Sequence, residues 1–143
     1  MNILIIDGMG GGIGKAVVDR IRSASSDYHI LAIGTNAIAA SAMRKAGADQ
    51  VATGENAIVY NSSHVDCIIG SIGIILANAM LGEISPRMAE AVILSNAAKI
   101  LIPTSKCNVT VLGVREQPIA QYIDEIPAIL QKLDKRDIFQ ITS

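Results

Sequence analysis

NILIIDGMGGGIGKAV, the run from Asn2 to Val17, decides the fold of this chain. It opens with a short apolar stretch, continues through a cluster of glycines and passes directly into an amphipathic helical pattern. In that pattern Ile13, Val17 and Ile21 fall on one stripe, so the expected helix has one apolar face. A strand, a glycine-rich turn and a helix in this order predict the first unit of a Rossmann-like sheet.

The remaining sequence repeats this alternation of apolar runs and helical patterns. It predicts strands at 2–7, 29–33, 50–53, 65–69, 99–102 and 109–114, and helices at 12–22, 36–47, 54–63, 73–98 and 118–133. Asn36 and Gly47 are the expected caps of the second helix. Ser85 and Pro86 are expected to restart the long fourth helix, and Pro127 to bend or restart the last one.

Alternating strands and helices predict an α/β fold with three layers, a doubly wound Rossmann-like sheet of strand order 3-2-1-4-5-6. The link 103–108 between the last two strands is too short for a parallel crossover, which needs about a dozen residues. Strand six is therefore expected to run antiparallel, at an edge of the sheet. We expect residues 1–143 to form a single Rossmann-like nucleotide-binding domain.

Composition narrows the class of protein further. Ile, Ala, Leu and Val dominate the 50% of residues that are hydrophobic, which suits strands buried on both faces. The net charge of -1, the absence of a basic block and the few aromatic residues predict no nucleic-acid partner. The two cysteines and two histidines lack metal-ligand spacing, so we expect no metal site and a reducing, cytoplasmic setting. The uncharged stretch 67–82 is shorter than a membrane span of roughly 20 residues and is interrupted by glycines, so no membrane association is expected.

The glycine-rich turn is the expected ligand site. Glycines let the backbone come close to a ligand, and the N–H groups at the start of a helix favour an anion. Tight strand–helix packing is the other reason for glycines, but four within 10–14 exceed that need, since each costs about 0.5–1 kcal/mol relative to Ala in regular structure. We expect a nucleotide phosphate to bind at Gly8, Met9, Gly10, Gly11, Gly12, Ile13 and Gly14. The carboxylate of Asp7 is expected to stabilise the turn.

Other strand ends should lie beside this turn, because ligands of doubly wound sheets bind along the carboxyl edge. The expected additional binding residues are Thr35 and Asn36 after the second strand, Gly70, Ser71, Ile72 and Gly73 after the fourth, and Thr104, Ser105 and Lys106 after the fifth. Cys107 follows directly and could act as a nucleophile, although the sequence places no His beside it. A P-loop is a competing interpretation of Gly14-Lys15, but Met9 and Ala16 stand where its first Gly and its metal-binding hydroxyl belong.

Gly8, Gly12 and Gly14 form the spacing G-x-x-x-G-x-G, and this turn resembles that of the short-chain dehydrogenase/reductase family. The resemblance implies NAD or NADP as the cofactor and places 70–73 near its ribose, although the Asn of that family's segment is missing here. The family's Tyr-x-x-x-Lys pair is also missing, because the residues four positions after Tyr28, Tyr60 and Tyr122 are Ala32, His64 and Ile126. No acid follows the second strand to hold a ribose. The reduction chemistry of that family is therefore not implied.

The whole chain is similar to a small, uncharacterised bacterial Rossmann-like family, on residues 6–14, 99–103 and 107–113. That similarity implies a fold and no reaction. Three hypotheses remain open: a nucleotide-binding module without chemistry of its own, a small NAD(P)-dependent oxidoreductase that uses residues of the carboxyl edge or of a partner subunit, and a structural oligomer without a ligand.

A homo-oligomer, most simply a dimer, is expected from the apolar residues of the long helical region. That region carries more apolar surface than one sheet face can cover, in Ile74, Ile75, Leu76, Met80, Leu81, Met88, Val92, Ile93 and Leu94. Exposed apolar patches of this size mark interfaces.

Overall fold

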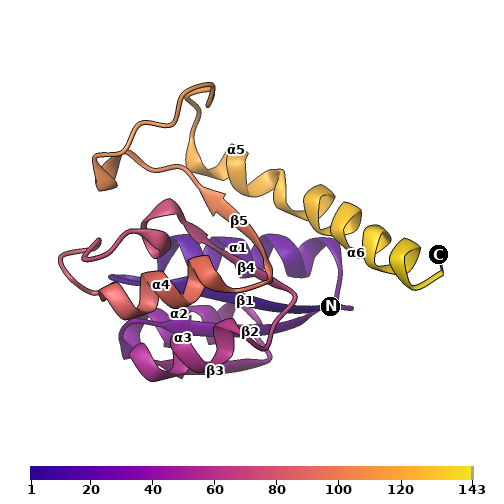
Figure 1. The fold of residues 1–143 in the computed structure, drawn as a ribbon, viewed down its shortest axis with the longest axis horizontal. Helices are drawn as coiled ribbons and strands as arrows, with labels where there is room; N and C mark the ends of the chain where they lie inside the picture. Colours follow the sequence, from indigo (N-terminus) through magenta and orange to yellow (C-terminus); the bar gives the residue numbers. More distant parts are fainter. Residues whose placement is uncertain (143) are drawn as a thin grey trace.

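A computed structural model describes the backbone of residues 1–142 and the side chains of residues 1–135. Its centre is a parallel sheet of five strands: β1 (Asn2–Asp7), β2 (His29–Gly34), β3 (Gln50–Thr53), β4 (Cys67–Ser71) and β5 (Ala98–Ile102). The strands lie in the order β3-β2-β1-β4-β5 (Figure 1). The sheet confirms a Rossmann-like α/β fold for the first five expected strands, and it places β1 at the centre.

Helices cover both faces of the sheet and complete three layers (Figure 1). One face carries α1 (Gly12–Ala24), α2 (Ala37–Ala46), α5 (Ile119–Asp124) and α6 (Ile126–Thr142), and the other carries α3 (Glu55–Ser62), the 3₁₀ helix η1 (Ile72–Ile75) and α4 (Pro86–Leu94). Side chains of β1 alternate between the faces: Ile3 and Ile5 belong to the first core, and Leu4 and Ile6 to the second. Burial on both faces explains why β1 is continuously apolar.

The expected helix caps are confirmed. The side chain of Asn36 accepts a hydrogen bond from the Ala39 N–H at 2.9 Å, and Gly47 ends α2 in the left-handed region at φ 116°. Ser85 caps α4 by accepting from the Met88 N–H at 3.2 Å, with Pro86 at the first helical position. The last helix ends at Asp124 and restarts as a second helix at Ile126, one residue before Pro127, which agrees with the expected restart at that proline.

The prediction of a sixth strand at 109–114 is wrong. Residues 103–118, which we call the arm, contain only the 3₁₀ helix η2 (Ser105–Cys107) and turns, and they extend away from the sheet (Figure 1). Asn108 and Gly113 have φ of 53° and 86°, and such left-handed residues break an extended strand. The apolar residues Val109, Val111, Leu112 and Val114 are therefore exposed, and β5 remains the edge of the sheet.

The prediction of a long fourth helix at 73–98 is also wrong. Residues 76–85 form a loop between η1 and α4, in which Asn78, Met80 and Leu81 have positive φ. A right-handed helix cannot pass through such residues. Of the apolar side chains expected on an interface, Ile74, Met88 and Val92 are buried inside the chain itself, whereas Leu81, Ile93 and Leu94 are exposed. In the described residues no helix is long and apolar enough to cross a membrane.

Candidate functional site

The carboxylate of Asp7 holds the glycine-rich turn together. Asp7 ends β1, and its Oδ1 and Oδ2 accept hydrogen bonds from the N–H groups of Gly8 and Gly14 at 2.8 and 2.6 Å. The Gly11 N–H donates to the Gly8 carbonyl at 3.0 Å and closes the turn between them. One side chain thus joins the end of the strand to the first turn of α1, as the sequence suggested for Asp7.

Asp7 is almost fully buried, with 5% of its surface exposed. Burial raises the pKa of its carboxyl group, the N–H groups of Gly14 and Gly8 oppose that rise, and the nearby Glu83 carboxylate adds to it. The two N–H bonds and the positive end of the α1 dipole compensate the charge when it is present. Asp7 is a structural anion beneath the turn.

The glycines of the turn fall into two groups. A Cβ on Gly8, Gly11 or Gly14 would come within 2.8 Å of another residue, for Gly11 2.7 Å from the Ala39 Cα and for Gly14 2.5 Å from the Met43 Sδ. These three are packing glycines, and Gly11 also needs its φ of 76°. A Cβ on Gly10 or Gly12 would meet no atom within 4 Å. Packing explains the first group and leaves the second for a different role.

The open side of the turn presents free donors. In the described part of the chain the N–H groups of Gly10, Gly12 and Ile13 have no protein acceptor, whereas those of Gly8, Met9, Gly11 and Gly14 do. Gly12 and Ile13 are the first residues of α1, where helix N–H groups lack internal partners. Three free N–H groups and the space around Gly10 and Gly12 can accommodate an anion.

Thr35 and Asn36 lie beside the turn, as expected, and they bring in a residue that sequence reasoning missed. The Asn36 Nδ2 donates to the Met9 carbonyl at 3.0 Å and to Glu83 Oε1 at 2.8 Å. Glu83 Oε2 in turn accepts from the Met9 N–H at 2.8 Å. The bond from Asn36, assisted by that from Met9, holds the pKa of Glu83 below its ordinary value. No local pattern marked Glu83, because it reaches Met9 from 74 residues away.

The segment after β4 contains a glycine that packing explains and a hydroxyl group that packing does not explain. Gly70 packs within the sheet, because a Cβ there would lie 2.8 Å from the Ile6 carbonyl oxygen. Ser71 ends the strand with 4% of its surface exposed, and its Oγ has no hydrogen-bond partner among the described residues. Ile72 and Gly73 begin η1 at the carboxyl edge. Ser71 is the residue of this segment whose polar group is unexplained by packing.

The segment after β5 contributes less than expected. Ser105 and Lys106 are exposed, and the hydroxyl of Thr104 accepts from the Lys106 N–H within the arm. Cys107 is half-buried, and its Sγ would lie 3.1 Å from a Cβ on Gly73. His29 begins β2 and His64 precedes β4, so both lie at the opposite, amino edge of the sheet. The structure therefore brings Cys107 to the carboxyl edge without a histidine beside it.

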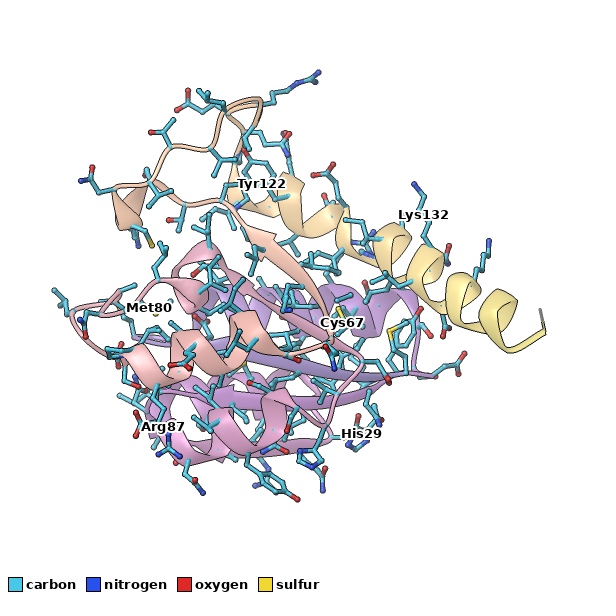
Figure 2. The ribbon with its side chains drawn as sticks, in the orientation of Figure 1. His29, Cys67, Met80, Arg87, Tyr122 and Lys132 are labelled. Atoms are coloured by element: carbon cyan, nitrogen blue, oxygen red, sulfur yellow. The ribbon has the colours of Figure 1, made fainter. Side chains whose placement is uncertain are left out.

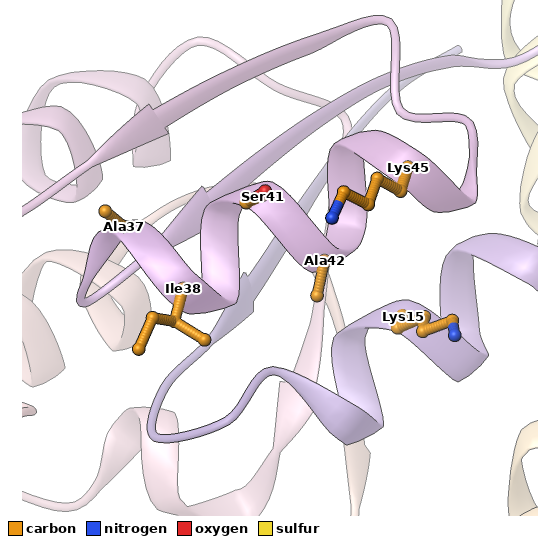
Figure 3. A pocket seen from close by; sticks show the side chains of 6 residues that line it. All are labelled: Lys15, Ala37, Ile38, Ser41, Ala42 and Lys45. Carbon is orange, nitrogen blue, oxygen red and sulfur yellow. The ribbon is translucent and has the colours of Figure 1, made fainter.

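A groove of about 470 Å³ between α1 and α2 borders the turn. Figure 3 shows the side chains that line it: Lys15, Ala37, Ile38, Ser41, Ala42 and Lys45. Lys15 lies in this groove between the helices, so it does not make the contact of a P-loop lysine within the turn. Lys15 and Lys45 instead give the groove two positive charges.

Comparisons with known proteins give a family and a structural likeness. Among curated proteins, none matches this sequence. Among solved structures, the chain is similar to a dodecameric FMN-dependent UbiX-like decarboxylase from Escherichia coli O157:H7, with 17% identity, a TM-score of 0.45, and coverage of 92% of this chain and 76% of that one. The family model that matches covers residues 2–135, and it is not the short-chain dehydrogenase/reductase family, so that resemblance is limited to the turn. The chain belongs to the family described as a domain of unknown function, DUF3842.

Proposed function

We propose that this protein binds a nucleotide through the phosphate that its glycine-rich turn can hold. The observation that carries the proposal is the set of three free N–H groups, on Gly10, Gly12 and Ile13, next to open space at both glycines. Backbone donors at the start of a helix are the usual site for a nucleotide phosphate at the carboxyl edge of a doubly wound sheet.

The two carboxylates of the site are compatible with an anion. Asp7 is beneath the turn with both oxygens bonded to N–H groups, and Glu83 is held by Asn36 and Met9 on one side of it. Lys15 and Lys45 line the groove between α1 and α2 and give it positive charge. The first candidate ligands are NAD and NADP, because their pyrophosphate fits a Rossmann-like turn.

The proposed role is binding, with any chemistry supplied by the ligand or by a partner subunit. Asp7 and Glu83 use both of their carboxylate oxygens to hold the backbone or side chains of the site. A small oxidoreductase remains the alternative, and Cys107 at the carboxyl edge is the observation that favours it.

Substitution of Gly12 tests the proposal. Gly12→Val adds a branched side chain where nothing of the protein lies within 4 Å, so the fold should persist while the phosphate is excluded. A ligand at 100 times its dissociation constant stabilises by about 2.7 kcal/mol, which a thermal-shift assay with NAD⁺, NADP⁺, ADP and inorganic pyrophosphate detects. We expect the variant to lose affinity by more than about tenfold, or about 1.4 kcal/mol. Ala128→Val, an exposed change in the first turn of α6, is the matched control.

Equal binding by the folded Gly12→Val variant would show that the turn is a packing device. Failure of the parent protein to respond to any of the four ligands would favour the structural oligomer.

We also propose that the protein is a homo-oligomer in which a second copy covers the arm. The arm, which follows the edge strand β5 in the chain, exposes the side chains of Val109, Val111, Leu112 and Val114. An open edge strand and apolar residues next to it form a surface that a second copy can cover.

A further inference from the structure

Two hydroxyl groups at the carboxyl edge are buried without a hydrogen-bond partner in the described residues. They are the Thr35 Oγ1 after β2, which lies beside the Glu83 carboxylate and helps to lower its pKa, and the Ser71 Oγ at the end of β4. A buried hydroxyl without a partner is unfavourable, and native proteins contain few of them. Thr35 directly follows β2 and Ser71 ends β4, and these two strands flank β1, so the two residues lie on opposite sides of the end of β1.

The side chain of Met80 occupies the region between these hydroxyls. A Cβ on Gly8 would lie 2.8 Å from the Met80 Sδ and 2.8 Å from the Thr35 Oγ1. A Cβ on Gly73 would lie 3.4 Å from the Met80 Cε, 3.2 Å from the Ser71 Oγ and 3.1 Å from the Cys107 Sγ. A thioether is a weak acceptor, so Met80 covers both hydroxyls without satisfying either. Figure 2 shows Met80 at the end of the molecule where the 76–85 loop lies, away from Cys67.

The loop that carries Met80 has a strained backbone, and the backbone hydrogen bonds of residues 78–84 join residues of the loop itself. Met80 and Leu81 have φ of 58° and 57°, an uncommon conformation for long side chains, and Leu81 is 95% exposed. Asn78 and Ile84 close the loop with an N–H to carbonyl bond of 2.7 Å. Glu83 joins it to the turn through Met9 and Asn36. A strained backbone conformation persists only where neighbouring contacts maintain it, and the Glu83 bonds are among those contacts here.

We infer that Met80 fills a subsite for the sugar hydroxyls of the bound nucleotide, and that residues 76–85 open as a lid to admit them. This inference rests on the proposed function for the identity of the ligand. A sugar hydroxyl can both donate to and accept from Thr35 and Ser71, which Met80 cannot. The Glu83 carboxylate, with an oxygen 3.2 Å from a Cβ on Gly8, disfavours a second anion at this place. Opening replaces two unsatisfied hydroxyls with two hydrogen bonds.

Binding of ADP and of inorganic pyrophosphate separates the subsite from the turn. Pyrophosphate reaches only the turn, whereas ADP also carries a sugar. Ser71→Ala should weaken ADP about three- to tenfold by loss of one hydrogen bond, and should leave pyrophosphate unchanged. Met80→Ala should tighten ADP about fivefold, because less of the binding energy is used to open the lid. Leu81→Ala, in the same strained conformation but exposed, is the matched control and should bind ADP like the parent.

The rate at which the native cysteines are labelled measures opening of the lid in the absence of a ligand. The Cys107 Sγ and the Met80 Cε both lie beside Gly73, whereas Cys67 is buried in β4, where burial raises the pKa of its thiol to about 12. An aromatic disulfide reagent should therefore label Cys107 alone, and Cys107→Ser should abolish the signal. Met80→Ala should speed the labelling at least about threefold, since a populated open state is what the reagent detects. Glu83→Gln, which keeps the apolar packing of Met80 but weakens the bonds to Met9 and Asn36, should speed it in the same direction.

The two assays distinguish failure of the lid from failure of the turn. Equal labelling rates in the parent, Met80→Ala and Glu83→Gln would overturn the lid. Parent-like affinity for ADP in both Ser71→Ala and Met80→Ala would overturn the subsite and leave phosphate binding at the turn intact. Absence of binding of either ligand to every variant would overturn the subsite together with the proposed function, and the labelling rates would still decide whether the lid opens.

Discussion

The glycine-rich turn and the arm both leave the carboxyl ends of parallel strands, and both were expected to bind a ligand. In the turn, a buried carboxylate bonds to two N–H groups and three glycines pack against neighbouring residues. In the arm, apolar side chains are exposed, and the hydroxyl of Thr104 bonds only to the next-but-one N–H. Neighbouring elements therefore fix the backbone of the turn and leave that of the arm exposed.

The difference follows from the places of β1 and β5 in the sheet. β1 is paired on both sides, and α1 starts five residues after its last residue and packs back on it. β5 is an edge strand, and the chain returns to a helix only at Ile119. The four predictions that follow test this contrast.

The largest effect is expected for Gly14→Ala. Its Cβ would meet the Met43 Sδ at 2.5 Å and the Asp7 Cβ at 2.8 Å, so either the Asp7 bonds or the contact with α2 must give way. Overpacking of this kind costs about 3 kcal/mol of unfolding free energy, measured by urea denaturation. Gly12→Ala is the matched control in the same helix turn and should be neutral or stabilising by up to about 1 kcal/mol. Equal stabilities of the two variants would remove the distinction between packing and open glycines.

Asp7→Asn should destabilise the protein by about 1 kcal/mol at neutral pH. An amide can accept from only one of the Gly8 and Gly14 N–H groups and turns its NH₂ toward the other, and relief of the buried charge offsets part of that loss. Because burial raises the pKa of Asp7 in the folded state, the folded protein binds this proton more tightly than the unfolded chain.

The difference in unfolding free energy between the parent and Asp7→Asn should change in one direction with pH. The stability advantage of the parent over Asp7→Asn should be greatest below the ordinary carboxyl pKa of 3.8 and should decrease as the pH rises through the raised folded pKa. Denaturation of both proteins at several pH values measures the difference. An advantage that grows with pH over this range would show that the N–H bonds outweigh burial.

Glu83→Gln should reduce stability by less than about 1 kcal/mol, because a carboxylate near the surface is screened by solvent. The folded pKa of Glu83 is lowered, so its contribution is present above the unfolded pKa near 4.5 and is lost as the pH falls through the lower folded value. Glu116→Gln in the arm, where Glu116 is exposed, should have no effect. A loss of stability that is the same at acid and neutral pH would contradict the role of the charge in holding Met9 and Asn36.

The smallest effect on folding is expected in the arm. Leu112 is 93% exposed, so Leu112→Ser should change the unfolding free energy of the isolated chain by no more than about 0.5 kcal/mol. Its effect should appear instead in self-association, where loss of an apolar contact should raise the dissociation constant about tenfold. Analytical ultracentrifugation over a range of concentrations measures this. A monomeric parent protein at micromolar concentration would refute the proposed covering of the arm.

Sequence by itself determined the features that depend on residues close together in the chain. Apolar runs marked the five strands within two residues at each end, and Asn36, Gly47, Ser85 and Pro86 marked helix ends through their own backbone preferences. The glycine turn could be located for the same reason, since strand, glycines and helix are consecutive. Asp7 was correctly assigned to the turn because its partners lie within seven residues.

Tertiary structure alone decided which parts of the carboxyl edge meet. It separated the open Gly10 and Gly12 from the packing glycines, because that distinction depends on contacts with α2 and the 76–85 loop. It brought Glu83 to Met9 and Met80 to Gly8 across more than seventy residues. It also left 109–114 without a strand partner, although the sequence is apolar and β-branched. Pairing, burial and charge contact are properties of neighbours in space, and a local pattern cannot encode which neighbours those will be.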